Sequence, residues 1–404
     1  MTILPKLNDK NVNYVLETVE AVTERSRDRR AGSKGEEQAR SILLNELMKF
    51  CDETNEQSFI THPGAGTLLH KILSICLIVS VFLFSVALSG GYVMPIAISL
   101  ILNLAVFGIY AHKFLFDGTA LDVIRLKKKS ANIYGKRYCR GDTATRIVIT
   151  AHVDSPMCLR SFAFGNVTLN VLNLCSLLGN TILFTSQLFC LFAGVPVNSD
   201  LFDFLRILCI IFVPFYIASI FIINPKHTAS GVSSSLLPSG IALSVMKQLF
   251  DESFRYEKTE VCILLTGSEY SGRAGAYAFA KKHKRLFSDV PTVFIPLEEI
   301  TSSDNLIVMF KDGSGTKGSA QAASVIAQAA ENLNLKLAKE TPMIGTAAFT
   351  PFALNDFEAC SLGTSKKLIA KSMSASGDKI TAVRRKTIGD VASLLLETLN
   401  YYDS

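Results

Sequence analysis

The stretch Arg146-Ile-Val-Ile-Thr-Ala-His-Val-Asp-Ser155 decides the fold that this sequence predicts. Its first six residues form a short, mostly apolar run, which is typical of a strand buried in a parallel sheet. The run leads into His152 and Asp154, which point the same way in an extended chain because side chains alternate along a strand. Ligands bind at the carboxyl ends of strands in open parallel sheets. The stretch therefore predicts a strand with a functional site at its end.

Two further runs repeat this arrangement. Val261–Thr266 is followed by Glu269 and Tyr270, and Val293–Leu297 is followed by Glu298 and Glu299. Helical spacing of apolar residues separates or flanks the runs at residues 12–29, 35–50, 233–250, 273–284 and 388–401. Alternation of strands and helices predicts an α/β domain with a mixed, mostly parallel sheet and helices on both faces. A single His-x-Asp arises easily by chance and strand-end glutamates are usually solvated, so only the recurrence at three strand ends favours a site.

Charged residues are scarce and unevenly spread. The chain has 404 residues, of which 49% are hydrophobic and 19% charged, whereas about 25% charge is usual in soluble domains. No Asp, Glu, Lys or Arg lies between Lys71 and Lys113 or between Arg160 and Asp200. About 20 apolar residues cross a bilayer as a helix, and buried core helices this long seldom lack charge. The runs predict transmembrane helices at 68–89, 93–115, 170–193 and 206–223. Such a composition excludes a disordered chain and an ordinary soluble enzyme.

The predicted spans form two hairpins, at residues 68–115 and 163–223. They interrupt one soluble domain, made of residues 1–67, 116–162 and 224–404. Lys and Arg are in excess between Lys113 and Arg160, and the short connectors inside the hairpins carry neither. The positive-inside rule then places both termini of this multi-pass protein in the cytoplasm, at the cell membrane. We interpret the basic segment as an anchor on anionic lipid and expect no nucleic-acid partner. The nine cysteines form no CxxC pair, which fits a reducing compartment.

Several segments together resemble one family, the co-catalytic zinc aminopeptidases and carboxypeptidases of clan MH, relatives of bacterial leucyl aminopeptidase. Residues 30–39 resemble its RxxGSxGexxA signature, and Ala151–Ser155 matches its HxDS. Residues 229–231, 267–275, 295–298 and 350–352 are similar to its DNASG, EExGLxGS, NLDMxG and HxPF segments. The order and spacing imply the zinc-exopeptidase fold for nearly the whole soluble part.

The resemblance also implies a site, which this sequence has altered. Members of the family hold two zinc ions through two His, two Asp and one Glu, and a second Glu is the general base. Here His152 stands at the first His, His227 at the bridging Asp, Tyr270 at the Glu ligand, Glu298 at the other Asp, Lys371 at the late His, and Glu269 at the base. A two-zinc site is therefore not expected. One zinc remains conceivable, held by His152, His227 and Glu298 with an open fourth position. In that arrangement Asp154 orients the His152 imidazole and the ammonium of Lys371 replaces the second cation.

Three functions follow from these residues. The first, which we favour, is a catalytically inactive peptidase-like protein that binds a peptide or a membrane-protein partner, because Ala348 and Phe349 replace the Asp-His pair of the HxPF segment. The second is a mononuclear zinc peptidase with Glu269 as base. The third is a small transporter or channel subunit, for which Asn170, Asn173 and Asn180 would supply a polar face, although such residues more often join helices.

Chain connectivity predicts where the site lies. His152 precedes the second hairpin by a few residues and His227 follows it closely, so both lie within roughly 30 Å of the bilayer at about 3.4 Å per extended residue. The ligand is therefore expected to be close to the membrane. Association of two copies through the hairpins is compatible with the sequence, although no motif specifies it.

Overall fold

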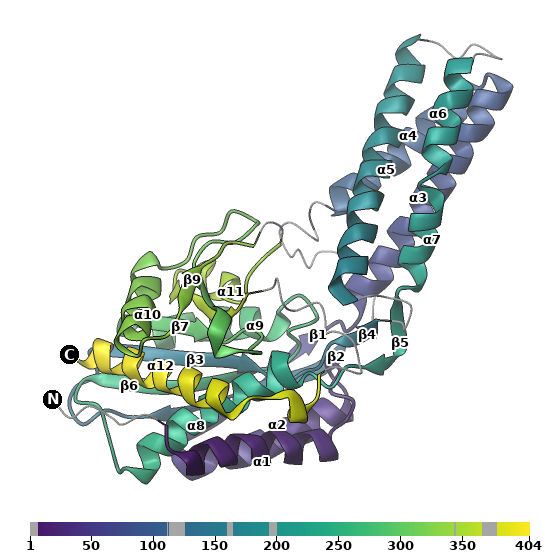
Figure 1. Ribbon diagram of the computed structural model, residues 1–404. Helices are drawn as coiled ribbons and strands as arrows, with labels where there is room; N and C mark the ends of the chain where they lie inside the picture. Colours follow the sequence, from purple (N-terminus) through teal and green to yellow (C-terminus); the bar gives the residue numbers. More distant parts are fainter. Residues whose placement is uncertain are drawn as a thin grey trace. The chain divides into compact units, whose positions relative to one another are not determined.

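The computed structural model describes residues 7–110, 112, 126–159, 165–193, 200–342, 345–365 and 378–404. The chain divides into two compact units. The first unit consists of Met1–Pro63, Arg125–Met157 and Lys226–Ser404, and the second of Gly64–Ile124 and Cys158–Pro225. Figure 1 labels the helices and most of the strands of both.

A six-stranded sheet organises the first unit. The strand order is β1 (Glu53–Thr61), β2 (Lys128–Arg137), β6 (Thr259–Thr266), β3 (Thr145–His152), β7 (Thr292–Pro296) and β10 (Glu358–Ala359). The pairings from β6 to β10 are parallel, whereas β1, β2 and β6 pair antiparallel. The predicted mixed, mostly parallel sheet is confirmed. His152 is paired with Thr266 and Thr150 with Pro296, so β3, β6 and β7 end at the same edge.

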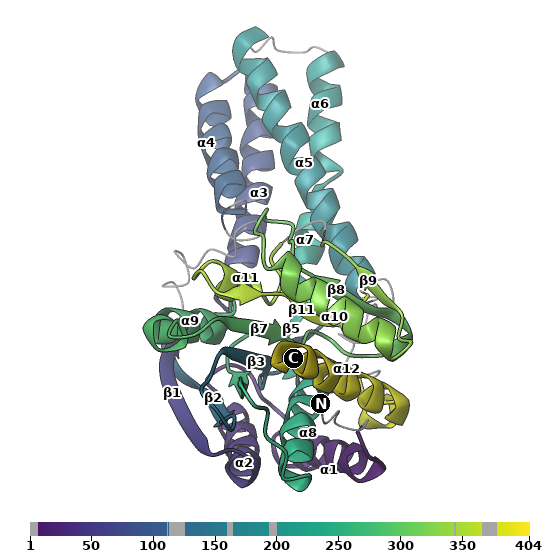
Figure 2. The same ribbon diagram turned by 90° about the vertical axis from the view of Figure 1, so that its left-hand side faces the viewer.

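Helices cover both faces of this sheet (Figure 2). The helices α1 (Asp9–Arg25), α2 (Lys34–Phe50), α8 (Leu237–Asp251) and α12 (Arg385–Asp403) pack on one face, and α9 (Ala274–Phe287) and α11 (Thr350–Ala353) on the other. Alternation along β3 explains the two cores. Ile147 and Ile149 enter the larger core, whereas Val148 between them enters the core that contains Phe279 of α9.

Smaller elements complete the first unit. A three-stranded sheet has the order β11 (Ser361–Thr364), β8 (Leu306–Met309) and β9 (Leu337–Lys339), and α10 (Ala320–Asn332) lies between β8 and β9 in the chain. A π-helical turn, η3 (Val232–Leu236), leads into α8, and short 3-10 turns lie at η4 (Ser303–Asn305) and η6 (Ile380–Ala382).

The first predicted helix is shorter than expected. We predicted a helix over residues 12–29, but α1 ends at Arg25. The Ser26 main-chain N–H and hydroxyl both donate to the Val22 carbonyl, so the last turn is closed there. The chain then runs without helical structure to Ser33, whose side chain accepts a hydrogen bond from the Glu36 N–H and begins α2. This connection directs Arg29 into the protein interior.

The second unit is a bundle of apolar helices: α3 (Ala65–Gly90), α4 (Val93–Tyr110), α5 (Gly165–Ala193), α6 (Asp200–Ile210) and α7 (Val213–Phe221). Thr67–Gly90, Val93–Tyr110, Leu174–Ala193 and Asp200–Phe221 are long and apolar enough to cross a membrane. The first hairpin turns at Gly91, where φ is +66°. A strand β4 (Met157–Leu159) pairs with β5 (Ile223–Thr228) where the chain passes between the units.

The predicted start of the fourth span needs correction. The fourth candidate span begins at Asp200 rather than at Arg206, and it is interrupted after Ile210. Pro214 lies in the first turn of α7, where a missing N–H is tolerated, but it cannot continue the helix that precedes it. The predicted end of the second span, at residue 115, lies outside the described residues.

Candidate functional site

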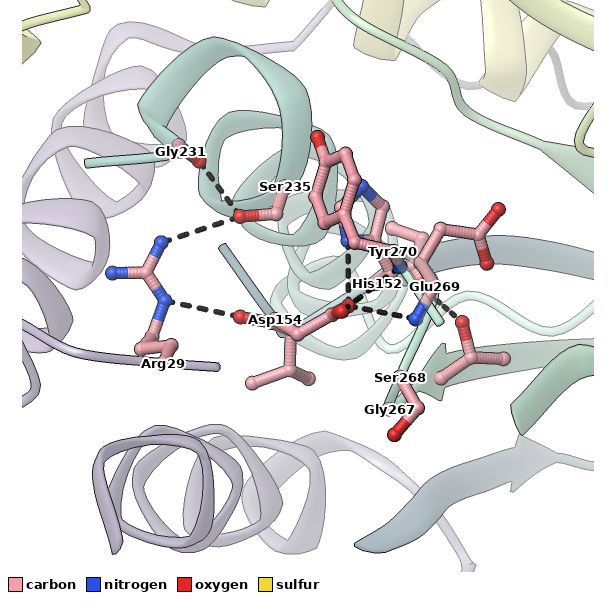
Figure 3. A network of polar contacts seen from close by, with 12 residues as sticks. Arg29, His152, Asp154, Gly231, Ser235, Gly267, Ser268, Glu269 and Tyr270 are labelled. Atoms are coloured by element: carbon pink, nitrogen blue, oxygen red, sulfur yellow. Dashed lines mark hydrogen bonds and ion pairs between the residues drawn. The ribbon is translucent and has the colours of Figure 1, made fainter. Parts of the chain in front are cut away.

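Asp154 is the centre of a polar network at the ends of β3 and β6 (Figure 3). Its carboxylate is completely buried. Oδ1 lies 3.1 Å from His152 Nδ1 and accepts the Glu269 N–H at 3.0 Å, and Oδ2 accepts the Tyr270 N–H at 3.1 Å. The carboxylate therefore fixes both the His152 ring and the turn after β6. Because Nδ1 is engaged, Nε2 is the ring nitrogen left to contact a further group, which is the usual arrangement of a metal-binding histidine.

His152 is held between Asp154 and an aromatic ring. The rings of His152 and Tyr270 meet edge to face, with 5.3 Å between centroids. Burial opposes the charged imidazolium, but the hydrogen bond and charge of Asp154, with the charge of Glu269, outweigh it and raise the pKa of His152. Tyr270 remains 43% exposed. A phenol therefore lines the site where the resemblance places a carboxylate ligand.

Glu269, the predicted base, is engaged by a cation. Its Oε1 lies 3.1 Å from Arg273 Nε, and the two side chains are only 16% and 20% exposed. The Glu269 carboxylate is turned away from Asp154 (Figure 3). Arg273 also donates to the Thr346 carbonyl at 2.9 Å and to the Thr346 hydroxyl. The Glu269 carboxylate would have to accept a proton if it were the base. The Arg273 guanidinium instead connects this carboxylate to the segment before α11.

Glu298 is engaged by the same segment. Its Oε1 accepts a hydrogen bond from the Ala348 N–H at 2.9 Å. Ala347 and Phe349 on either side are buried in the core that contains α9. The positions at which the resemblance expects an Asp-His pair are therefore occupied by a main-chain donor and a core phenylalanine. One segment, Gly345–Phe349, holds both strand-end acids through Arg273 and Ala348.

Arg29 is a site residue that the sequence reasoning missed. Its side chain is completely buried. Nε donates to the Val153 carbonyl at 3.0 Å, and the terminal nitrogens donate to the carbonyls of Ser26 at 3.3 Å and Ser230 at 2.5 Å. Burial lowers the pKa of Arg29 to about 10, against the opposing charges of Asp154 and Asp378. The guanidinium links the end of α1, the end of β3 and the segment before α8.

This arginine corrects the assignment made from the resemblance. We placed the arginine of the RxxGSxGexxA signature at Arg30, but Arg30 forms an exposed ion pair with Asp28. Arg29 is the arginine that precedes Gly32 by three residues, as that signature requires. The spacing was thus the available signal, and the structure shows its physical basis.

Glu36 is a second buried group that was not among the predicted site residues, although it stands at the glutamate of the RxxGSxGexxA signature. It is 1% exposed, and its carboxylate accepts hydrogen bonds from the Gly32 N–H, the Ser130 hydroxyl and the Ser268 N–H at 2.6, 2.9 and 3.0 Å. Burial, with the negative charge of Asp154, raises the pKa of Glu36 to about 7. Glu36 therefore also supports, through the Ser268 N–H, the turn that carries Glu269 and Tyr270.

The described donors do not by themselves fit a zinc ion. No group of three His, Cys, Asp or Glu side chains in the described part of the chain is arranged to hold a metal. Both oxygens of Asp154 accept main-chain hydrogen bonds, and Glu269 and Glu298 are engaged by Arg273 and Ala348. His227 lies in β5, but the structure does not describe its side chain. Lys371 lies outside the described residues. These donors therefore support no zinc-dependent step.

Known structures share this fold. No protein-family model matches the chain, and no curated protein matches it in sequence. A leucine aminopeptidase precursor from Bacteroides thetaiotaomicron has a TM-score of 0.57 and 10% identity over 99% of each chain. A Zn-dependent exopeptidase from Parabacteroides distasonis (TM-score 0.54, 12% identity) covers 98% of this chain and 99% of its own, and a glutaminyl cyclase from Porphyromonas gingivalis (0.55, 11%) covers 98% and 100%.

These similarities define the class of fold. The chain has the zinc-exopeptidase-like α/β fold that aminopeptidases, exopeptidases and glutaminyl cyclases share. At such low identity the likeness carries the fold alone, because one fold supports many activities. The altered site has to decide the function.

Proposed function

We propose that this chain is an integral membrane protein whose cytoplasmic, zinc-exopeptidase-like unit binds a membrane-proximal peptide or protein segment without catalysis. One observation carries the proposal. The two strand-end acids that hydrolysis would use are already engaged within the chain, Glu269 by Arg273 and Glu298 by the Ala348 N–H.

The four apolar helices support the membrane location. Large apolar side chains face outward from the bundle, among them Phe82, Ile101 and Phe192 at 64%, 67% and 88% exposure. A soluble protein rarely exposes so many, whereas a lipid environment requires them. The Lys and Arg excess between Lys113 and Arg160 supports a cytoplasmic position of the first unit.

The altered positions support a binding role. Metal-assisted hydrolysis needs a water molecule whose pKa a metal ion has lowered and a free base to take its proton. Among the positions carried over from the resemblance, Tyr270 supplies a phenol in place of a carboxylate and Phe349 is part of the core. The half-exposed Tyr270 side chain remains at the site as a group that can contact a peptide.

A mononuclear zinc peptidase is the second candidate, and one observation favours it. His152 presents Nε2 while Asp154 holds Nδ1, as in many zinc sites. His227 and Glu298 would be the remaining ligands.

Metal content separates the two. The full-length protein in nanodiscs is incubated with zinc, desalted and assayed for bound zinc and for leucyl-p-nitroanilide hydrolysis, as wild type, His152→Ala and His227→Ala. His283→Gln on α9 is the matched control. We expect no site-specific zinc and no turnover. One zinc per chain that is lost in both alanine variants but kept in the control, together with turnover abolished by Glu269→Gln, would establish the enzyme instead.

Binding near the membrane has its own test. A peptide library displayed on liposomes and the same library free in solution are presented to the full chain and to a variant whose hairpins are replaced by Gly/Ser connectors. We expect the full chain to bind the liposome-displayed peptides more tightly than the free peptides. We expect the variant to bind both displays equally. Equal binding of both displays by both proteins would contradict a membrane-proximal ligand.

A further inference from the structure

The interior of the helical bundle contains a polar seam. Ser80 of α3 and Ser99 of α4 join their hydroxyls at 2.7 Å, and Gln187 of α5 donates to both. Asn103 of α4 continues the seam, because its Nδ2 donates to Gln187 Oε1 at 3.2 Å. In this part each side-chain amide or hydroxyl finds a partner on another helix.

Further along the seam, polar side-chain oxygens lack hydrogen-bond partners. The oxygens Asn103 Oδ1, Asn180 Oδ1, Tyr216 Oη, Ser176 Oγ and Ser219 Oγ are buried and have no hydrogen-bond partner among the described residues. The side chains are between 0% and 5% exposed. Asn103, Asn180 and Tyr216 belong to one region. Asn103 Nδ2 also donates to the Asn180 carbonyl at 3.4 Å, and Gly179 lies directly against the Tyr216 hydroxyl.

Such oxygens are costly in a membrane. A buried polar group without a partner costs about 1–3 kcal/mol, and hydrocarbon supplies no water. Ser176 and Ser219 can turn toward carbonyls of their own helices. The two amide oxygens cannot, because they accept hydrogen bonds and need donors. The buried side chains of the described bundle helices include no Asp, Glu, Lys or Arg.

We infer that Asn103, Asn180 and Tyr216 form an internal binding site for a small uncharged hydrogen-bond donor, namely water. A buried water molecule makes about three hydrogen bonds to groups of this kind. It can donate to both amide oxygens and accept from the Tyr216 hydroxyl. The bundle is then hydrated between α4, α5 and α7, while the network around Gln187 stays dry.

The sign of one stability change tests this. In the full-length protein in nanodiscs, Tyr216→Phe removes a partner of the bound water, so we expect the unfolding midpoint to fall by about 2–4 °C. If the hydroxyl is a dry, unpaired group, its removal raises the midpoint. A raised or unchanged midpoint overturns the inference. Tyr92→Phe, at an exposed turn, is the matched control and leaves the midpoint unchanged.

A second variant makes the test independent of stability. In a background in which the other cysteines are alanine, Asn180→Cys is compared with Leu178→Cys, which is 50% exposed on the outside of α5. The S–H stretching band in the infrared spectrum moves to lower wavenumber when a thiol is hydrogen-bonded to water. We expect the band of the Asn180→Cys thiol to lie at lower wavenumber than that of the outward-facing Leu178→Cys thiol. An equal or higher band position at residue 180 overturns the inference.

Discussion

Arg29 Nε donates a 3.0 Å hydrogen bond to the carbonyl of Val153, the residue between His152 and Asp154. The same guanidinium reaches Ser26 and Ser230, so a single buried cation ties together three chain segments that are distant in sequence. The position of the His152–Asp154 pair thus depends on a residue of the connection between α1 and α2.

Replacing Arg29 should therefore be far more damaging than replacing its neighbour. Arg29→Met leaves three buried carbonyls without a donor, and we expect a loss of about 3–5 kcal/mol in the free energy of unfolding. Arg30→Met removes a half-exposed ion pair with Asp28, so its effect should stay within about 1 kcal/mol. Denaturant unfolding of both variants measures this. Equal effects would contradict the assigned role of Arg29.

Arg273→Ala should loosen the segment Gly345–Phe349. The change removes the ion pair with Glu269 and the two hydrogen bonds to Thr346, at an expected cost of about 1–2 kcal/mol. Faster amide hydrogen exchange confined to this segment and the Glu269 turn is the specific readout. Lys281→Ala on the exposed face of α9 is the control. Unchanged exchange in Arg273→Ala would refute the clamp.

Glu36 should make stability depend on pH near neutrality. Burial raises its pKa from 4.5 to about 7 in the folded protein, so the folded state binds the proton more tightly than the unfolded state. The stabilisation is complete below pH 4.5 and is lost as the pH rises through 7. Glu36→Gln cannot titrate, so its unfolding midpoint relative to wild type should rise between pH 5 and 8. For the exposed Glu37→Gln control, the difference in unfolding midpoint from wild type should not change with pH. A pH-independent difference in both variants would exclude Glu36 as the source of the pH dependence.

Substitution of alanine for glycine should have opposite effects on stability at Gly275 and Gly389. A Cβ on Gly275 would lie closer than 3.0 Å to the Gly267 carbonyl and to Asn132 Oδ1, so Gly275→Ala should push α9 from the site and cost about 1–3 kcal/mol. A Cβ on Gly389, inside α12, meets no atom within 4 Å. Gly389→Ala should therefore stabilise by about 0.5–1 kcal/mol. The unfolding midpoints of the two variants measure these effects. A shift of the midpoint in the same direction for both variants would be inconsistent with the packing.

The proposed topology predicts which residues face the outside. Tyr92 lies between α3 and α4 and is 61% exposed, and Lys281 is exposed on α9. In a cysteine-free background, Tyr92→Cys should react with a membrane-impermeant maleimide in intact cells. Lys281→Cys should react only after permeabilisation. The reverse pattern would invert the orientation.

The core strands were predictable because their sequences are continuous apolar runs, as in β3, β6 and β7. The strand β2 was not, since Lys128–Arg137 reads as polar. Arg137 is nevertheless buried there, because its guanidinium donates to the carbonyls of Phe50, Leu249 and Phe254. A local sequence pattern does not predict the burial of Arg137, because its hydrogen-bond partners lie on other elements.

The site divides in the same way. The contact between His152 and Asp154 follows from a spacing of two residues in extended chain. The ion pair between Glu269 and Arg273 depends on a turn in which Ser268 and Arg273 adopt φ of +59° and +50°, conformations that their residue types do not signal.

The sequence by itself determined the elements: apolar runs as buried strands, charge-free runs as helices long enough to cross a bilayer, and the order of residues that resembles zinc exopeptidases. Tertiary structure alone decided what the polar residues do. Arg29 and Glu36 became supports of the site, and Glu269 and Glu298 became partners of Arg273 and Ala348. The physical reason is that apolar burial is a property of a segment and its period, whereas the role of a buried charge depends on the donors and acceptors that distant segments bring to it.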